Sequence, residues 1–143
     1  MNKIVEYFKS QTGKELTQSP SPAGMWLKPV LIEVKEGYLK AEFTVRAEMT
    51  NPAGMLHGGM ITLIADEMTG ATIATLNLPD FYPSINLYTD FLSSAKQGEK
   101  ITAEAKIIRK GKNIINTECL IYNSENKLIA KSQSNNIKSN NRK

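Results

Sequence analysis

The chain has 143 residues, which is enough for one ordinary domain with a single hydrophobic core. Its 41% hydrophobic and 22% charged residues argue against disorder and against a coiled coil. The net charge of +4 is unevenly spread: residues 1–95 hold 7 Lys or Arg against 10 Asp or Glu, and residues 96–143 hold 11 against 4. The basic carboxyl-terminal third could serve nucleic acid, a polyanionic small molecule or solubility alone. A nucleic-acid recognition motif is missing and aromatic residues are few, so we expect no nucleic-acid partner.

The sequence also limits which cellular compartment and which cofactors are expected for this protein. Its most apolar stretch, Met60 to Leu76, contains two acids and is too short to span a bilayer, and residues 1–9 lack the apolar core of a signal peptide. We therefore expect a cytoplasmic protein that does not bind membranes. One cysteine, Cys119, cannot form an internal disulfide, and one histidine, His57, cannot form a His-rich metal site. We expect no metal and no separate cofactor.

The first 50 residues predict a short helix and two strands. Residues 2–11 place four apolar side chains near helical spacing, which predicts an amphipathic helix, and the Pro-rich segment 19–24 ends it. From Leu39 to Ala47, apolar and polar residues alternate with the period of a strand that has one buried and one solvated face. The segment from Trp26 to Lys35 is the predicted partner strand, joined by a turn at Glu36-Gly37.

The rest of the chain predicts one long helix and four more strands. Residues from about 59 to 76 are apolar on nearly every side of a helix, which predicts a buried helix. The alternating pattern then predicts strands over 84–91, 101–107, 115–122 and 128–134. Residues 138–143 are polar, and we expect them to fray. The order predicts one α+β domain over residues 1–143, in which a curved antiparallel sheet wraps around a single central helix.

Two adjacent carboxylates, Asp66 and Glu67, interrupt the apolar helix. Carboxylates are rarely buried without a partner, so one on such a helix has either a partner or a chemical task. Successive helical positions differ by about 100° in direction, so the two side chains cannot serve one pocket equally well. We expect only one of them to be catalytic. The alternative is that a carboxylate here pairs with a lysine or caps another element.

The helix is entered through His57, Gly58 and Gly59. The first N–H groups of a helix have no internal acceptor and lie at the positive end of its dipole, so Gly58 and Gly59 can present donors to a developing oxyanion. Glycine also lets a substrate approach the backbone closely. The alternative is that two glycines simply allow a tight entry into the helix.

These residues resemble a known family. The chain contains the pattern Asn51-x5-His57-Gly58-Gly59-x6-Asp66, followed by Ser84 at the start of a strand and by Phe91-Leu92-x2-Ala95-x2-Gly98-Glu99. This pattern is similar to that of the hotdog-fold acyl-CoA thioesterases, specifically their phenylacetate-pathway (PaaI-like) branch. The resemblance runs from about residue 51 to residue 134, and the hotdog topology agrees with the order of elements predicted above.

The resemblance implies a role for each motif residue. The Gly58 N–H would supply the oxyanion hole, Asn51 would orient the thioester, and Ser84 would help to place water. The helix acid would be Asp66 rather than Glu67, acting as base or nucleophile. The resemblance leaves the acyl group open, and we expect residues 1–50 and the loop 78–83 to shape the acyl pocket.

Thioester hydrolysis needs no metal and no serine-histidine-acid triad. The carbonyl is already electrophilic, so a carboxylate that activates water and one or two oxyanion donors are sufficient. Whether Asp66 attacks the carbonyl directly or deprotonates water stays open. His57 has no identifiable third group, so it either positions the substrate or leaving group or is purely structural.

Coenzyme A would enter as part of the substrate. Its 3′-phosphate and pyrophosphate could meet the basic turn at residues 109–113, although surface lysines at hairpins are also common. The expected CoA contacts are Gly59, Phe91, Lys96, Arg109, Lys110, Gly111, Lys112 and Asn113.

The spacing of the site residues predicts a shared active site. Gly58 and Asp66 are eight residues apart, or roughly 12 Å along a helix, so one thioester carbon can hardly touch both. A two-fold homodimer with antiparallel helices would bring Asn51 and Gly58 of one subunit beside Asp66 and Ser84 of the other. The resemblance also implies assembly into a dimer of dimers.

Two other functions stay open for a hotdog domain. One is a non-catalytic module that binds acyl-CoA, which loss of Asp66 or Asn51 would favour, although both residues are present. The other is a hydratase or dehydratase, which needs a histidine and an acid arranged for proton transfer at carbon. The position of His57 in the glycine entry favours the thioesterase.

Overall fold

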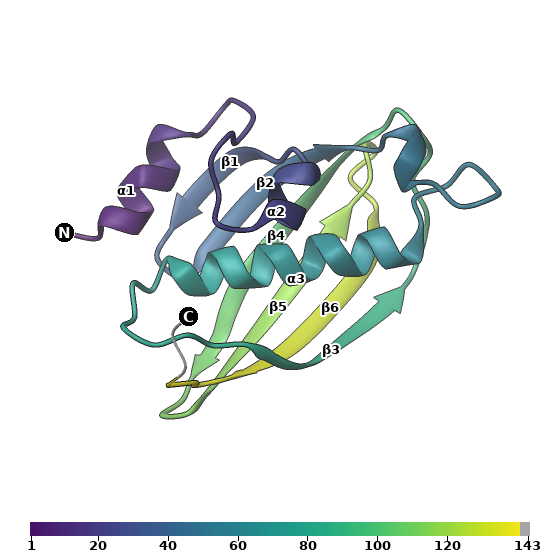
Figure 1. The fold of residues 1–143 in the computed structure, drawn as a ribbon. Coiled ribbons are helices and arrows are strands. Elements are labelled where there is room, and N and C mark those ends of the chain that lie inside the picture. The colour runs from purple at the N-terminus through teal and green to yellow at the C-terminus, as the bar shows by residue number, and fades with distance from the viewer. Residues whose placement is uncertain (141–143) are drawn as a thin grey trace.

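Six antiparallel strands form one curved sheet, and a long helix lies across its concave face (Figure 1). The computed structural model describes residues 1–140. The strands stand in the order β1-β2-β4-β5-β6-β3. Their bounds are β1 Val30–Lys35, β2 Tyr38–Thr44, β3 Ser84–Phe91, β4 Lys100–Lys110, β5 Ile114–Tyr122 and β6 Leu128–Ile137. The helices are α1 Lys3–Ser10, α2 Pro22–Trp26 and α3 Gly58–Ala74, with a 3-10 turn at Ala47–Met49. The predicted α+β hotdog arrangement is confirmed.

The strands form where apolar and polar residues alternate. In β4, Ile101, Ala103 and Ala105 are fully buried against α3, while the residues between them face outward. The outer face carries ion pairs, such as Lys40 with Glu104 at 3.4 Å and Lys106 with Glu118 at 3.4 Å. Part of the basic carboxyl-terminal third is therefore paired on the solvated face of the sheet.

Helix α3 is buried on one side and open on the other. Ile64, Ala65 and Met68 pack into the core. A stripe on the opposite side is exposed and consists of Gly59, Asp66, Gly70 and Ala74. The prediction of a helix buried all round was therefore wrong, because these small or charged residues recur at spacings of seven and four and so share one helical face.

The amino-terminal region contains one helix that was predicted and one that was not. Helix α1 is the predicted one, and Asn2 caps it by accepting a hydrogen bond from the Val5 N–H at 3.1 Å. Ser21 caps the unpredicted α2, whose Pro22 stands at its first position, where a missing N–H costs nothing. Trp26 therefore ends a helix instead of beginning a strand, and its ring lies 4.6 Å from the Arg46 guanidinium.

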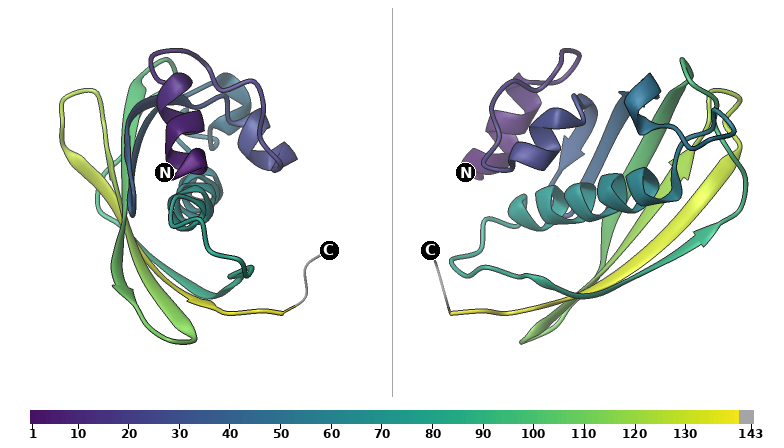
Figure 2. Two further views of the ribbon diagram at one scale, coloured as in Figure 1. Left: turned by 90° about the vertical axis from the view of Figure 1, so that its left-hand side faces the viewer. Right: turned by 45° about the vertical axis from the view of Figure 1, so that its right-hand side comes forward.

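The two edges of the sheet differ. The outer edge of β1 is covered by residues 13–16, where the N–H groups of Gly13 and Leu16 donate to Leu31 O and Pro29 O. Figure 2 shows α1 and α2 on the same side of the sheet as α3, near this edge. At the opposite edge, β3 pairs with β6 only, and within residues 1–140 nothing covers its other side. Four large apolar side chains of β3 and the residue after it are more than half exposed: Ile85, Tyr88, Phe91 and Leu92.

Residues 138 and 139 are more ordered than predicted. Strand β6 continues to Ile137, and the Lys138 N–H then donates to Asn113 O. The Ser139 N–H donates to Phe81 O, and Lys138 Nζ lies 3.2 Å from the Asp80 carboxylate. The predicted fraying is therefore wrong for residues 138 and 139, and residues 141–143 lie outside the described part.

Two further features follow from the fold. Cys119 lies buried in β5, where burial raises the pKa of its thiol to about 12. Within residues 1–140, no helix is both long and apolar enough to cross a bilayer.

Candidate active site

The Asp66 carboxylate and the Ser84 hydroxyl meet between α3 and the start of β3. Ser84 Oγ donates to Asp66 Oδ1 at 3.0 Å, and both residues are exposed. They lie in a surface hollow of about 480 Å³. The hollow is lined by Gly59, Thr62, Leu63, Asp66, Ser84, Ile85, Asn86 and Leu87. The carboxylate is thus accessible to a substrate and already holds a hydroxyl group.

Glu67 contacts a different part of the protein. Its carboxylate accepts a hydrogen bond from Ser21 Oγ at 2.8 Å, and Ser21 is the residue that caps α2. The two neighbouring carboxylates therefore have separate surroundings, as the helical geometry predicts. Through its hydrogen bond with Ser21, Glu67 links α3 to the start of α2. This matches the alternative that one of the two carboxylates interacts with the cap of another element.

The two glycines at the start of α3 differ in whether their N–H groups are already hydrogen-bonded. His57 caps the helix, because its Nδ1 accepts a hydrogen bond from the Gly59 N–H at 2.8 Å. The N–H groups of Met60 and Ile61 donate to His57 O. In the described chain, the Gly58 N–H has no acceptor, and it lies at the positive end of the helix. Only Gly58, and not Gly59, therefore keeps a backbone donor free for an oxyanion.

Phe91 lies directly over Gly58. A Cβ atom at Gly58 would stand 3.2 Å from Cε1 and 3.3 Å from Cζ of this ring. The ring is itself 57% exposed. Because Gly58 has no side chain, the Phe91 ring can pack directly against it, next to the free Gly58 N–H.

Asn51 is tied to the loop before α3 by its carbonyl oxygen. Its Oδ1 accepts hydrogen bonds from the N–H groups of Ala53 at 2.9 Å and Met55 at 3.1 Å. Among the described contacts, none uses the Asn51 Nδ2 group. The amide therefore has a fixed orientation and a donor left for a carbonyl oxygen.

The predicted site residues form two groups in the protomer. The first group lies where α3 begins and contains Asn51, His57, Gly58 and Phe91. The second contains Asp66 and Ser84, and Asp66 is roughly 12 Å from Gly58 along the helix axis. We call these the donor half and the acid half. The protomer brings together the residues of each half but does not join the halves.

The basic turn lies at the same end of the sheet as Ser84. Ser84 pairs with Asn136 on β6, and the next residue, Ile137, pairs with Ile114, which directly follows the turn. Within the turn, a Cβ at Gly111 would stand 2.6 Å from Arg109 Nη1, so the guanidinium lies against the glycine. The side chains of Arg109, Lys110, Lys112 and Asn113 are all exposed.

Lys96 does not join this turn within the protomer. It bridges to Met55, beside the donor half, and its N–H donates to the Glu99 carboxylate. Hydrogen bonds from Ser124 Oγ and then from the Lys96 N–H lower the pKa of Glu99. Lys96 therefore lies away from the basic turn within this chain, because the β3–β4 connection returns to the end of the sheet where α3 begins, and its contact with CoA stays a prediction.

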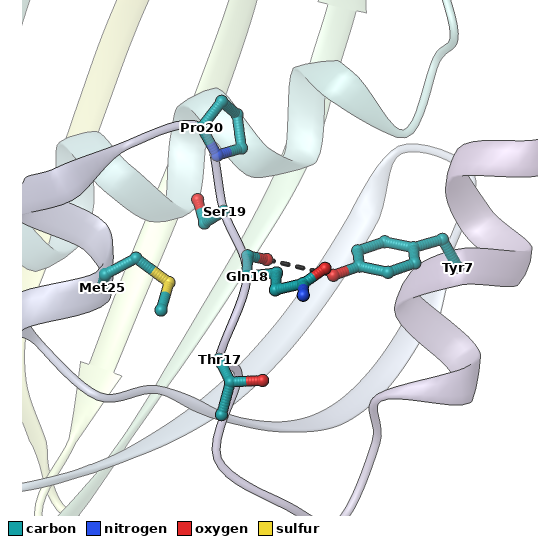
Figure 3. Close-up of a pocket in the computed structure, with 6 residues that line it drawn as sticks. All are labelled: Tyr7, Thr17, Gln18, Ser19, Pro20 and Met25. Atoms are coloured by element: carbon teal, nitrogen blue, oxygen red, sulfur yellow. Dashed lines mark hydrogen bonds between the residues drawn. The ribbon is translucent and has the colours of Figure 1, made fainter.

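A second hollow, of about 530 Å³, lies in the amino-terminal region (Figure 3). Its walls include Tyr7, whose hydroxyl donates to Gln18 O at 3.0 Å, and Met25. None of the predicted catalytic residues lines it.

Neither residues 1–50 nor the loop 78–83 lines the hollow around Asp66, so their part in an acyl pocket stays a prediction. Within residues 1–140, no three His, Cys, Asp or Glu side chains are grouped to hold a metal ion.

Sequence reasoning missed one residue of the acid half. Asn136 is 1% exposed, and its Oδ1 lies 3.1 Å from Ser84 Oγ. The alternation through Ala130, Ser132 and Ser134 continues to residue 136, which signals a buried strand position there but not the contact with Ser84. The strand was predicted to end at Ser134, which left Asn136 outside it.

Residues 53–130 match the thioesterase superfamily. The chain belongs to this superfamily. Over 100 residues it is 35% identical to an esterase of Archaeoglobus fulgidus, in a match that covers 70% of this chain and 64% of that protein. It is 32% identical to human acyl-coenzyme A thioesterase 13 over 106 residues, which cover 72% of this chain and 74% of the human protein.

Several solved structures share the fold. Zebrafish thioesterase superfamily member 2 superposes with a TM-score of 0.79 at 22% identity, over 96% of this chain and 97% of that one. A phenylacetic acid degradation-related protein of Ralstonia eutropha gives 0.75 at 27% identity, over 83% and 92%. A protein of Streptococcus mutans bound to acetyl CoA gives 0.74 at 17% identity, over 80% and 91%. The resemblance to the phenylacetate-pathway branch is thus confirmed.

Proposed function

We propose that the chain is an acyl-CoA thioesterase that hydrolyses an acyl- or aryl-acyl-CoA to the free acid and CoA. The observation that carries this proposal is the Asp66 carboxylate, which holds the Ser84 hydroxyl at 3.0 Å in an open hollow. A carboxylate that can activate water is the group that thioester hydrolysis needs most. The acyl-coenzyme A thioesterase among its relatives supports the choice of substrate.

The donor half would bind the thioester carbonyl. Its oxygen would accept hydrogen bonds from the Gly58 N–H and from Asn51 Nδ2, both of which are unoccupied in the described chain. These donors gain strength as negative charge develops on the oxygen, so they stabilise the transition state more than the substrate.

The acid half would supply the water, with Asp66 as general base. The water oxygen bonds to the carbonyl carbon, a water proton moves to Asp66, and the carbonyl electron pair moves to the oxygen held by Gly58 and Asn51. When the carbonyl re-forms, the carbon–sulfur bond breaks, and CoA leaves as a thiolate that takes up a proton.

A complete site would need two chains. Asp66 lies on the exposed stripe of α3, and Gly58 lies at the start of the same helix, roughly 12 Å away along its axis. A two-fold axis across this stripe would make the helices antiparallel and set the donor half of one subunit against the acid half of its partner. The open edge of β3, with its exposed apolar side chains, would be covered in the same dimer. Two such dimers would form the expected dimer of dimers.

The basic turn would bind the phosphates of CoA. Arg109, Lys110 and Lys112 are exposed at the end of the sheet where Ser84 lies, and phosphate groups are strong acceptors for such side chains. The acetyl CoA in the Streptococcus mutans relative supports a CoA ligand for this fold. CoA is then a part of the substrate, and the proposed chemistry uses no metal.

The release of free thiol from a panel of acyl-CoAs, followed with a thiol reagent, tests the proposed function. We expect turnover of at least one straight-chain or aryl-acyl thioester, and loss of turnover in Asp66→Asn. If no thioester is cleaved while calorimetry detects binding of CoA, the chain is a binding module and the proposal fails. Hydration of an enoyl-CoA without thiol release would favour a hydratase instead.

A further inference from the structure

We infer that Asn136 is a positioning residue that holds the Ser84 hydroxyl against Asp66 and accepts a hydrogen bond from it during turnover. The inference rests on the proposed function, because it assigns a task within that reaction. Asn136 lies on β6, directly opposite Ser84 on β3. It is 1% exposed, and a buried carboxamide must find hydrogen-bond partners for both of its ends.

The orientation of the Asn136 amide is determined by the neighbouring strand. Its Nδ2 donates to Ile115 O on β5 at 3.2 Å. A flipped amide would set two carbonyl oxygens against each other, so Oδ1 must face Ser84 Oγ, which lies 3.1 Å away. Ser134 Oγ is also within 3.5 Å of Oδ1, but its single proton has a better acceptor in Asn86 O at 2.9 Å. Ser84 is therefore the main donor available to Asn136.

Ser84 thus has one proton and two acceptors. Its Oγ lies 3.0 Å from Asp66 Oδ1 and 3.1 Å from Asn136 Oδ1, and a hydroxyl can donate to only one of them at a time. While Asp66 is ionised, its charge makes it the stronger acceptor, and Ser84 donates to it. The contact with Asn136 then restricts the rotation of the serine side chain.

The second acceptor becomes useful once Asp66 has taken the water proton. A turn of the Asp66 carboxyl group about its Cβ–Cγ bond points the new O–H at Ser84 Oγ, and the serine hydroxyl then turns and donates elsewhere. Asn136 Oδ1 is the acceptor for that turned hydroxyl. The three groups can therefore be satisfied both before and after proton transfer, without any movement of the backbone.

A double-mutant cycle with acyl-CoA substrates tests this role. Asn136→Leu removes the acceptor, and we expect kcat to fall roughly tenfold, as for the loss of one hydrogen bond, with KM within about twofold. Added to Ser84→Ala, the same change should lower kcat by less than about twofold, because Asn136 acts through the serine. Asn135→Leu is the matched control: it places the same side chain on the other face of the same strand and should leave kcat unchanged.

Three results would overturn the inference. These are a normal kcat in Asn136→Leu, an equal fall of kcat with and without the serine hydroxyl, and an equal fall in Asn135→Leu. If Asn136→Leu does not fold, Asn136→Thr, which suits a strand and is too short to reach Ser84, replaces it in the same cycle.

A crystal structure of the Asn136 variant separates this inference from the proposed function. We expect Ser84 to populate more than one rotamer there, and an unchanged single rotamer would contradict the positioning role even if the protein cleaved no thioester. Conversely, wild-type protein that cleaves no acyl-CoA while the variant frees Ser84 would refute the proposed function alone.

Discussion

The carboxylates of Asp66 and Glu67 are neighbours in sequence but contact different groups. Asp66 faces an open hollow and Ser84, whereas Glu67 accepts a hydrogen bond from the cap of α2. Asp66→Asn should keep the fold and lower kcat a hundredfold or more, which corresponds to about 3 kcal/mol of barrier. Steady-state kinetics and a melting curve for each variant measure both quantities.

Glu67→Gln is the matched control for this change. It keeps an acceptor for Ser21 Oγ and should leave kcat within about threefold of wild type. An active Asp66→Asn enzyme would refute the assigned base. A dead Glu67→Gln enzyme with a normal melting curve would move the role by one residue.

The role of the His57 side chain can also be tested by single substitutions. Because its Nδ1 caps α3, His57→Ala should lower the free energy of unfolding by about 1 kcal/mol. His57→Asn supplies another cap acceptor and should restore most of that stability. Denaturant unfolding measures the first effect, and kcat of the Asn variant separates the two open roles. A normal kcat means a structural role, whereas a low kcat in a stable protein means that the imidazole acts on substrate or leaving group.

At the scale of elements, the β4–β5 turn is the proposed contact for the CoA phosphates. Changing Lys110 and Lys112 together to Ala should raise KM for acyl-CoA and leave kcat nearly unchanged, because the phosphates are remote from the reacting carbon. Kinetics with acyl-pantetheine, which lacks the nucleotide, should be insensitive to the change. If both substrates respond equally, the turn does not bind the phosphates.

A control for charge is available in the same sheet. Lys106 and Lys131 both pair with Glu118 on the outer face, at 3.4 and 3.7 Å. Replacing Lys106 and Lys131 by Ala also removes two positive charges, as the change in the turn does, and should leave KM for acyl-CoA nearly unchanged. A similar rise in KM there would point to the general field of the protein rather than to the turn.

The individual helices and strands also show which parts of the fold could be predicted from the sequence. Strands β2 and β4 were predictable because burial on one face leaves a period in the sequence, and helix α3 was predictable because it is apolar on nearly every side. Helix α2 was not predicted, because Ser-Pro pairs are typical of an interruption, although Ser21 before Pro22 is also a helix-start signal. The contact of Lys138 and Ser139 with distant segments leaves no local pattern at all.

The site was predictable in its residues but not in its connections. The motif resemblance pointed to Asp66 and Ser84, and the structure brings them within hydrogen-bond distance. Which glycine keeps a free N–H depends on the His57 ring, and that contact follows from side-chain geometry rather than from spacing. Asn136 reaches Ser84 only through strand pairing across 52 residues of sequence, which periodicity within one strand cannot reveal.

At the scale of the whole molecule, the separation of the donor half from the acid half can be tested by complementation. Chains with Asn51→Ala and chains with Asp66→Ala should each be inactive. After subunit exchange, random pairing makes about half of the dimers mixed, and each mixed dimer has one intact site of two. Activity should therefore approach roughly a quarter of wild type. No recovery after verified exchange would show that the site lies within one chain.

Burial of Cys119 also bears on the redox chemistry of a reaction that releases a thiol. Disulfide exchange requires an accessible thiolate, and this cysteine is inaccessible and keeps its proton because its pKa is raised to about 12. Folded protein incubated with CoA disulfide should keep its intact mass, whereas protein unfolded in denaturant should gain one CoA. A mass gain in the native state would contradict this expectation. The sheet thus isolates the protein's one thiol from oxidised forms of the thiol that its proposed reaction produces.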